Sequence, residues 1–119
     1  MNLVQTFRRI GQLSGWSKAF ERQEYQLPLI KKLYSKNGLE IKLTCGGCPE
    51  QYDVLKDGNK VAYLRLRHGE FSVRHPDASG EEIMYEEPFG DGIFNDNERL
   101  IYLSKAMREI ILRISKPNN

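Results

Sequence analysis

The feature that most constrains the fold is an alternation of apolar and polar residues on both sides of one His-Gly pair. A two-residue loop at His68-Gly69 would make five cross-strand pairs: Arg67 with Glu70, Leu66 with Phe71, Arg65 with Ser72, Leu64 with Val73 and Tyr63 with Arg74. In this register apolar side chains meet apolar ones and opposite charges meet, which stabilises an antiparallel pair. The sequence therefore predicts a hairpin with one apolar and one polar face.

Similar alternation predicts strands before and after this hairpin. From Leu39 to Cys45 every second residue is apolar or cysteine, which indicates a half-buried strand. A CGGCP turn leads into a strand over residues 52–55, and Lys56-Asp57-Gly58 predicts a three-residue hairpin loop with glycine in the left-handed position. Residues 76–80 turn the chain again, into the strand EEIMYEE.

Helical patterns occupy the two ends of the chain. Near the C-terminus, Asn95 and Glu98 form an N-x-x-E capping box, and Lys116-Pro117 ends the helix. Its apolar stripe contains Leu100, Leu103, Met107, Ile110, Ile111 and Ile114. A short helix is predicted around Val4, Phe7 and Ile10, and another from Pro28 to Asn37-Gly38. The fold class is α+β: an antiparallel β meander of four to five strands packed against a C-terminal amphipathic helix, with a short helical N-terminal segment.

Length and charge limit the organisation and the function classes. With 119 residues, 39% of them hydrophobic, the chain suits one globular unit with a modest core. Residues 1–38 contain seven basic and two acidic residues, so we divide this unit into a basic helical segment, 1–38, and an α+β domain, 39–119. Since no apolar run could span a membrane and Arg8 and Arg9 interrupt any secretory signal, we expect a cytoplasmic protein with no membrane span.

Both cysteines lie in the CGGC stretch, Cys45 and Cys48. A thiol redox enzyme needs the first cysteine at a helix N-terminus, and here a strand follows. With His68 and His75 the pair could supply four zinc ligands, although the spacing matches no compact zinc-finger pattern. The third interpretation is a glycine-rich turn whose thiols pack as small apolar groups. We expect no cofactor and keep zinc as an alternative.

Two surfaces are candidates for binding. Tyr63, Arg65, Arg67 and Arg74 share the outer face of the central hairpin, where they could stack on bases and pair with phosphates. The simpler interpretation is a solvated face neutralised by Glu70 and by Glu82 or Glu86. At the N-terminus, Phe7, Arg8 and Arg9 could lie in a groove of a partner, or the apolar residues could dock on the chain's own sheet.

Three blocks, CPEQY at residues 48–52, YLRLRHG at residues 63–69 and GDGIF at residues 90–94, resemble a family of small uncharacterised proteins of bacteria and their phages. The resemblance covers roughly residues 45–112 and leaves the basic front unexplained. It implies a small soluble accessory protein that acts by binding, and it carries over no activity, ligand or catalytic residue.

These observations favour a small non-enzymatic protein-binding module, such as a phage or bacterial accessory or inhibitor protein, with an unidentified protein partner. No acid, base and nucleophile come together in the sequence as catalysis requires. A nucleic-acid-binding module that uses the Tyr63 and arginine face is the first alternative. A zinc-stabilised domain or a thiol enzyme centred on CGGC is the second.

Overall fold

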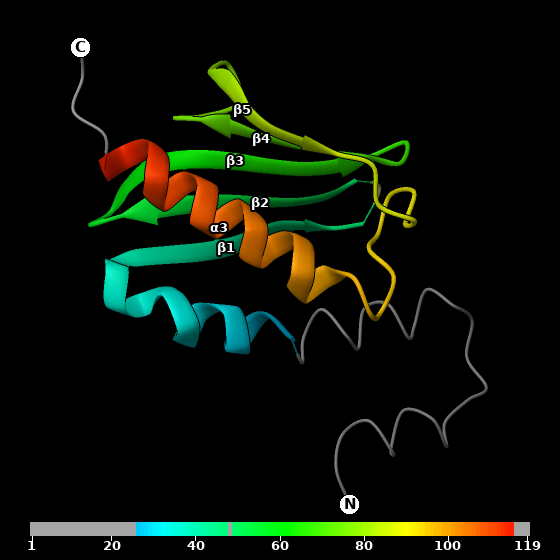
Figure 1. Cartoon of the computed structure of the whole chain (residues 1–119), viewed down its shortest axis with the longest axis horizontal. Coiled ribbons are helices and arrows are strands. Elements are labelled where there is room, and N and C mark those ends of the chain that lie inside the picture. The colour runs from blue at the N-terminus through cyan, green and yellow to red at the C-terminus, as the bar shows by residue number, and fades with distance from the viewer. Residues whose placement is uncertain (1–25, 48, 116–119) are drawn as a thin grey trace, which may run out of the picture.

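The computed structural model describes residues 26–47 and 49–115, and it has the expected α+β architecture. Five strands form one antiparallel sheet in sequence order: β1 (Leu39–Gly46), β2 (Glu50–Lys56), β3 (Asn59–Arg67), β4 (Glu70–His75) and β5 (Glu81–Glu86). The helix α3 (Arg99–Ser115) crosses one face of this sheet, and a helical segment at residues 26–34 lies below β1 in the view of Figure 1. The predicted meander of four to five strands and C-terminal helix are therefore confirmed.

The central hairpin has the predicted register. All five pairs on either side of His68-Gly69 form, from Arg67 with Glu70 to Tyr63 with Arg74. His68 and Gly69 have φ angles of 53° and 74°. Two consecutive left-handed residues give the turn a twist that matches the twist of the flanking strands.

The β2–β3 loop is one residue shorter than predicted. Lys56 pairs with Asn59, so only Asp57 and Gly58 form the turn, with φ angles of 52° and 85°. The prediction of a three-residue loop is wrong because the aspartate also adopts the left-handed conformation, which leaves Lys56 in the ladder. The β3 strand has one residue more than β2 in this part of the ladder. Val54 pairs with Ala62 and Leu55 pairs with Lys60, so Val61 lies between the two pairs.

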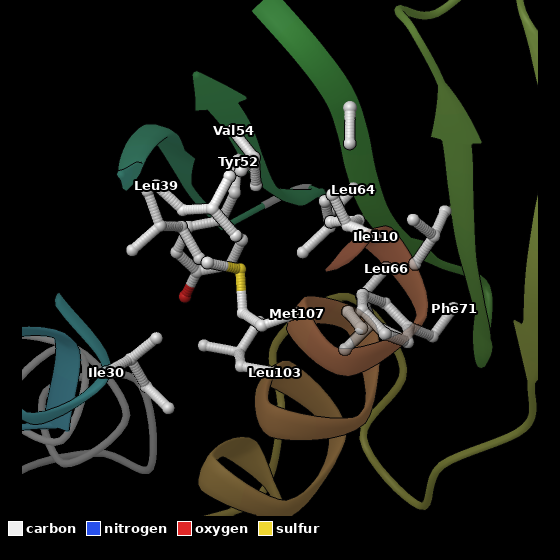
Figure 2. Close-up of a cluster of buried hydrophobic side chains, with 14 of the residues drawn as sticks. Ile30, Leu39, Tyr52, Val54, Leu64, Leu66, Phe71, Leu103, Met107 and Ile110 are labelled. Carbon is white, nitrogen blue, oxygen red and sulfur yellow. The ribbon is translucent and has the colours of Figure 1, made fainter. Parts of the chain in front are cut away.

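The core lies between the sheet and α3. One side chain in two along β2, β3 and β4 points to this side and is buried, as Figure 2 shows for Tyr52, Val54, Leu64, Leu66 and Phe71. From α3, Leu103, Ala106, Met107 and Ile110 complete the core, while the predicted stripe residues Leu100, Ile111 and Ile114 pack at its border. The opposite, polar face of the sheet does not pack against α3.

The helical segment at residues 26–34 belongs to the same core. Its Ile30 is fully buried and lies near Leu103 (Figure 2), and the Tyr34 hydroxyl donates to the Ser104 carbonyl at 3.3 Å. A 3-10 turn, η1 (Ser35–Asn37), follows, and the chain reverses at Gly38, whose φ of 75° gives the predicted stop.

The shorter helix predicted around Val4, Phe7 and Ile10 lies outside the described residues. None of the described helices is long and apolar enough to cross a membrane.

Candidate binding face of the sheet

The outer face of the sheet is organised in rows, because cross-strand partners point to the same side. One row contains Lys42, Asp53, Tyr63, Arg74 and Glu82, and the next contains Gln51, Arg65, Ser72 and Tyr85. All nine side chains are half-buried or exposed. The four residues predicted as a binding surface on the hairpin, Tyr63, Arg65, Arg67 and Arg74, therefore do share one accessible face.

A hollow lies in this face over β3, β4 and β5. Ser72 is short, and the side chains around it are long, so they leave a depression of about 330 Å³ above the strand. Its lining consists of Arg65, Arg67, His68, Glu70, Ser72, Arg74, Glu82 and Tyr85. Three guanidinium groups and two carboxylates thus meet at one concave site, which we call the arginine hollow.

The arginines of the hollow have few partners. Arg74 Nη1 donates to the Gly80 carbonyl at 2.9 Å, and Arg67 Nε donates to His68 Nε2 at 3.2 Å. Neither partner carries a negative charge. Within residues 26–47 and 49–115, no carboxylate forms an ion pair with Arg65, Arg67 or Arg74. The hollow therefore presents positive charge that the described part of the chain does not neutralise by direct pairing.

The acidic residues near the hollow are engaged elsewhere or only line it. The Tyr85 hydroxyl donates its one proton to Glu70 Oε1 at 2.7 Å, and Glu87 Oε1 lies 3.0 Å from the same hydroxyl. The hydrogen bond to Glu70 is the largest of the effects that raise the pKa of the Tyr85 phenol. Glu86 is on the opposite side of the sheet, where its carboxylate lies 3.3 Å from Lys105 Nζ of α3. Glu86 is thus not available to neutralise the arginines, whereas Glu82 remains at the border of the hollow.

The residues proposed as zinc ligands do not converge. Cys45 donates its thiol to the Gly47 carbonyl at 3.0 Å, and His75 Nδ1 donates to the Val61 carbonyl at 2.7 Å. His68 precedes β4 and His75 ends it; the strand has six residues. At about 3.3 Å per residue the Cα atoms of the two histidines are roughly 17 Å or more apart, which is too far for both side chains to reach one zinc ion at about 2 Å from each ring. Cys48 lies outside the described residues.

In the described part of the chain, no three His, Cys, Asp or Glu side chains are grouped so that they could hold a metal ion. Phe7, Arg8 and Arg9, predicted as a second binding surface, also lie outside the described residues.

A buried ion pair joins β2 to the first residue of α3, at the end of the sheet where the β3–β4 turn lies. Arg99 donates from Nε to Glu50 Oε2 at 2.9 Å and from Nη2 to Glu50 Oε1 at 3.0 Å, and both side chains have no exposed surface. Glu50 also accepts from the Tyr52 hydroxyl and from the Phe94 amide. Arg99 donates further to the Phe94 carbonyl and to Gln26 Oε1. Each nitrogen of the guanidinium and each oxygen of the carboxylate therefore has a partner within the protein, and the network stabilises the fold.

The loop between β5 and α3 is fixed by a second carboxylate. Glu98 accepts from three backbone amides, those of Phe89 (2.8 Å), Gly90 (2.8 Å) and Asn95 (2.9 Å). The bond from the Asn95 amide is the glutamate half of the predicted capping box, whereas the Glu98 amide donates to the Asn95 backbone carbonyl at 3.2 Å and α3 begins at Arg99. The Gly69 amide then donates to the Asp91 carbonyl at 2.8 Å. This contact joins the loop to the β3–β4 turn. That turn contains His68, which lines the arginine hollow.

Sequence reasoning missed Glu50 and Arg99, although a signal was present. Glu50 has the same inward parity on β2 as Tyr52 and Val54, and Arg99 lies four residues before Leu103 on the buried side of α3. A charged residue on the apolar side of each of two neighbouring elements indicates a buried pair, since an unpaired buried charge is very costly.

Comparison of the chain with models of protein families, with curated proteins and with solved structures finds no match. The resemblance carried by the CPEQY, YLRLRHG and GDGIF blocks therefore stays a prediction.

Proposed function

We propose that this protein is a small non-enzymatic binding module that contacts another protein through the outer face of its sheet. The observation that supports the proposal best is the arginine hollow, in which half-buried Arg65 has no ion-pair partner among the described residues. Arginine is favoured at protein interfaces because its planar guanidinium forms several hydrogen bonds at once. A partner that supplies acceptors would satisfy a group that the chain itself leaves open.

The mixture of charges on the face favours a protein partner. Basic and acidic side chains alternate along one row, from Lys42 and Asp53 to Arg74 and Glu82. A protein surface can match such a pattern with charges of both signs, and like-charge contacts would exclude other partners. A standard interface buries about 800 Å² on each side, which a five-stranded sheet face can provide. The expected role as a bacterial or phage accessory or inhibitor protein is part of this proposal.

Nucleic-acid binding is the second candidate, and the aromatic rings of the face support it. Tyr63 and Tyr85 lie in adjacent rows beside Arg65 and Arg74, and stacking between bases and aromatic rings contributes to the binding of single strands. Against it, Glu70 and Glu82 line the same hollow and would repel phosphates. We therefore rank a protein partner first.

A tagged pull-down from cell lysate, with and without nuclease, tests the proposal. We expect a protein to be retained in both arms at about 0.3 M salt, where exposed charge pairs are largely screened. The double variant Arg65→Ala/Arg67→Ala should lose that protein. The matched control, Lys31→Ala/Lys32→Ala, removes the same charge from the exposed surface of the 26–34 helix and should retain it. Retention that disappears with nuclease would favour the second candidate, and retention by both variants would contradict the proposal.

A further inference from the structure

We infer that the arginine hollow receives one acidic side chain of the partner, an aspartate or glutamate carboxylate, and that Arg65 is its principal donor. This inference rests on the proposed function, because it names the chemistry by which the same face recognises a protein.

The register places three arginines around Ser72 on the outer face of the sheet. Arg65 is directly opposite Ser72, Arg67 is two residues further along β3 on the same face, and Arg74 is two residues beyond Ser72 on β4. Such diagonal and i, i+2 neighbours have Cβ atoms about 7 Å apart, within reach of long side chains. An acceptor above Ser72 would therefore lie between Arg65 and Arg74 and beside Arg67.

The hollow has the room and the donors for a carboxylate. Its volume of about 330 Å³ is at the lower end for a ligand pocket, and it suits a side chain better than a whole cofactor. A guanidinium can donate two parallel hydrogen bonds to a carboxylate, a geometry that it also offers to a phosphate. The Ser72 hydroxyl forms no hydrogen bond with another described residue, so it can donate from the floor.

An incoming carboxylate would not need to displace a negative group of this chain. Glu70 accepts from Tyr85, and neither Glu70 nor Glu82 pairs with the three arginines in the described part of the chain. These two carboxylates nonetheless line the hollow, so a chain of phosphates would bring further negative charge against them. A single acidic residue flanked by basic residues matches the site better, since its neighbours can face Glu70 and Glu82.

Nuclear magnetic resonance of the full chain, labelled with nitrogen-15, tests the inference. The probes are an acetylated and amidated peptide with one glutamate between two lysines, the same peptide with glutamine in place of glutamate, inorganic phosphate, and a twelve-nucleotide oligo(dT). We expect the glutamate peptide to shift the Nε–H resonance of Arg65, and the glutamine peptide to leave it unchanged.

Variants distinguish binding at the arginine hollow from nonspecific attraction between opposite charges. Arg65→Ala should weaken binding of the glutamate peptide at least about tenfold, as the loss of hydrogen bonds to a charged group implies, and Arg65→Lys should restore only part of it. Arg108→Ala, on the exposed surface of α3, should have no effect. If Arg65→Ala does not give the amide spectrum of a folded protein, Arg65→Gln replaces it.

Equal binding of the two peptides, or tighter binding of oligo(dT) or phosphate than of the glutamate peptide, would overturn the inference. If the glutamate peptide fails while Arg65 and Arg67 are still required in the pull-down, the carboxylate assignment is wrong and the protein-binding proposal stands. If neither experiment depends on these arginines, both fail.

Discussion

At the scale of single residues, Glu50 and Arg99 form the ion pair that is completely buried, whereas the other ion pairs among the described residues are partly exposed. Removing one member of such a buried pair leaves the other charge without compensation, which typically costs about 3–5 kcal/mol. We expect Glu50→Gln to lower the free energy of unfolding by about that amount in urea denaturation. Lys105→Ala, which breaks the partly exposed pair with Glu86, should change it by less than about 1 kcal/mol. Equal effects of the two variants would contradict this account.

Tyr52 gives the protein a dependence on alkaline pH. Burial of the phenol, and then the negative charge of Glu50, raise the pKa of Tyr52 far above its ordinary value of 10.0. The unfolded chain therefore releases this proton at a lower pH than the folded chain. The Tyr52 contribution to stability is complete below pH 10 and is lost progressively as the pH rises above it.

Tyr52→Phe isolates this contribution. Loss of the hydrogen bond to Glu50 should cost about 1–2 kcal/mol at neutral pH. Between about pH 10 and 11.5 the variant should lose stability less steeply than the parent protein, by up to about 1.4 kcal/mol per pH unit. Urea midpoints measured across this range for both proteins provide the check, and parallel curves would show that Tyr52 ionises normally in the fold.

At the scale of elements, the loop from residue 87 to residue 98 is held by hydrogen bonds to Glu98 and to Gly69 and presents an exposed aromatic ring. Phe89 is 93% exposed, whereas a Cβ at Gly90 would lie 2.1 Å from the Ile93 carbonyl oxygen and 2.9 Å from Glu98 Oε2. Gly90→Ala should therefore lower the free energy of unfolding by about 3 kcal/mol, the upper range for overpacking. Phe89→Ala should change it by less than about 0.5 kcal/mol. Thermal and urea unfolding of the two variants check this contrast.

The elements were largely predictable because the strands alternate and the turns contain residues suited to positive φ. The His68-Gly69 hairpin, the stop at Gly38 and the apolar stripe of α3 all follow from local pattern. The two-residue turn at Asp57 and the buried position of Glu50 do not follow from local pattern alone. The length of the turn depends on whether Lys56 pairs with Asn59 of the neighbouring strand. The burial of Glu50 depends on the presence of Arg99 on α3.

At the scale of the whole molecule, the fold separates a structural side from an accessible side. Helices, the apolar core and the Glu50–Arg99 pair occupy one face of the sheet, and the hairpin's arginines occupy the other. Sequence parity predicted which residues share the outer face. It did not predict the hollow, because the depth of a surface depends on the short Ser72 among long neighbours and on β5 pairing beside β4.

The most direct test of the central claim is site-specific photocrosslinking. A photoreactive amino acid is placed at exposed Glu82, which lines the arginine hollow, and in a second protein at exposed Arg108 on α3. If the outer face of the sheet is the binding surface, illumination in lysate should join one protein to position 82 and leave position 108 without that product. A product at position 108 alone, or nucleic acid as the main product at position 82, would contradict the account.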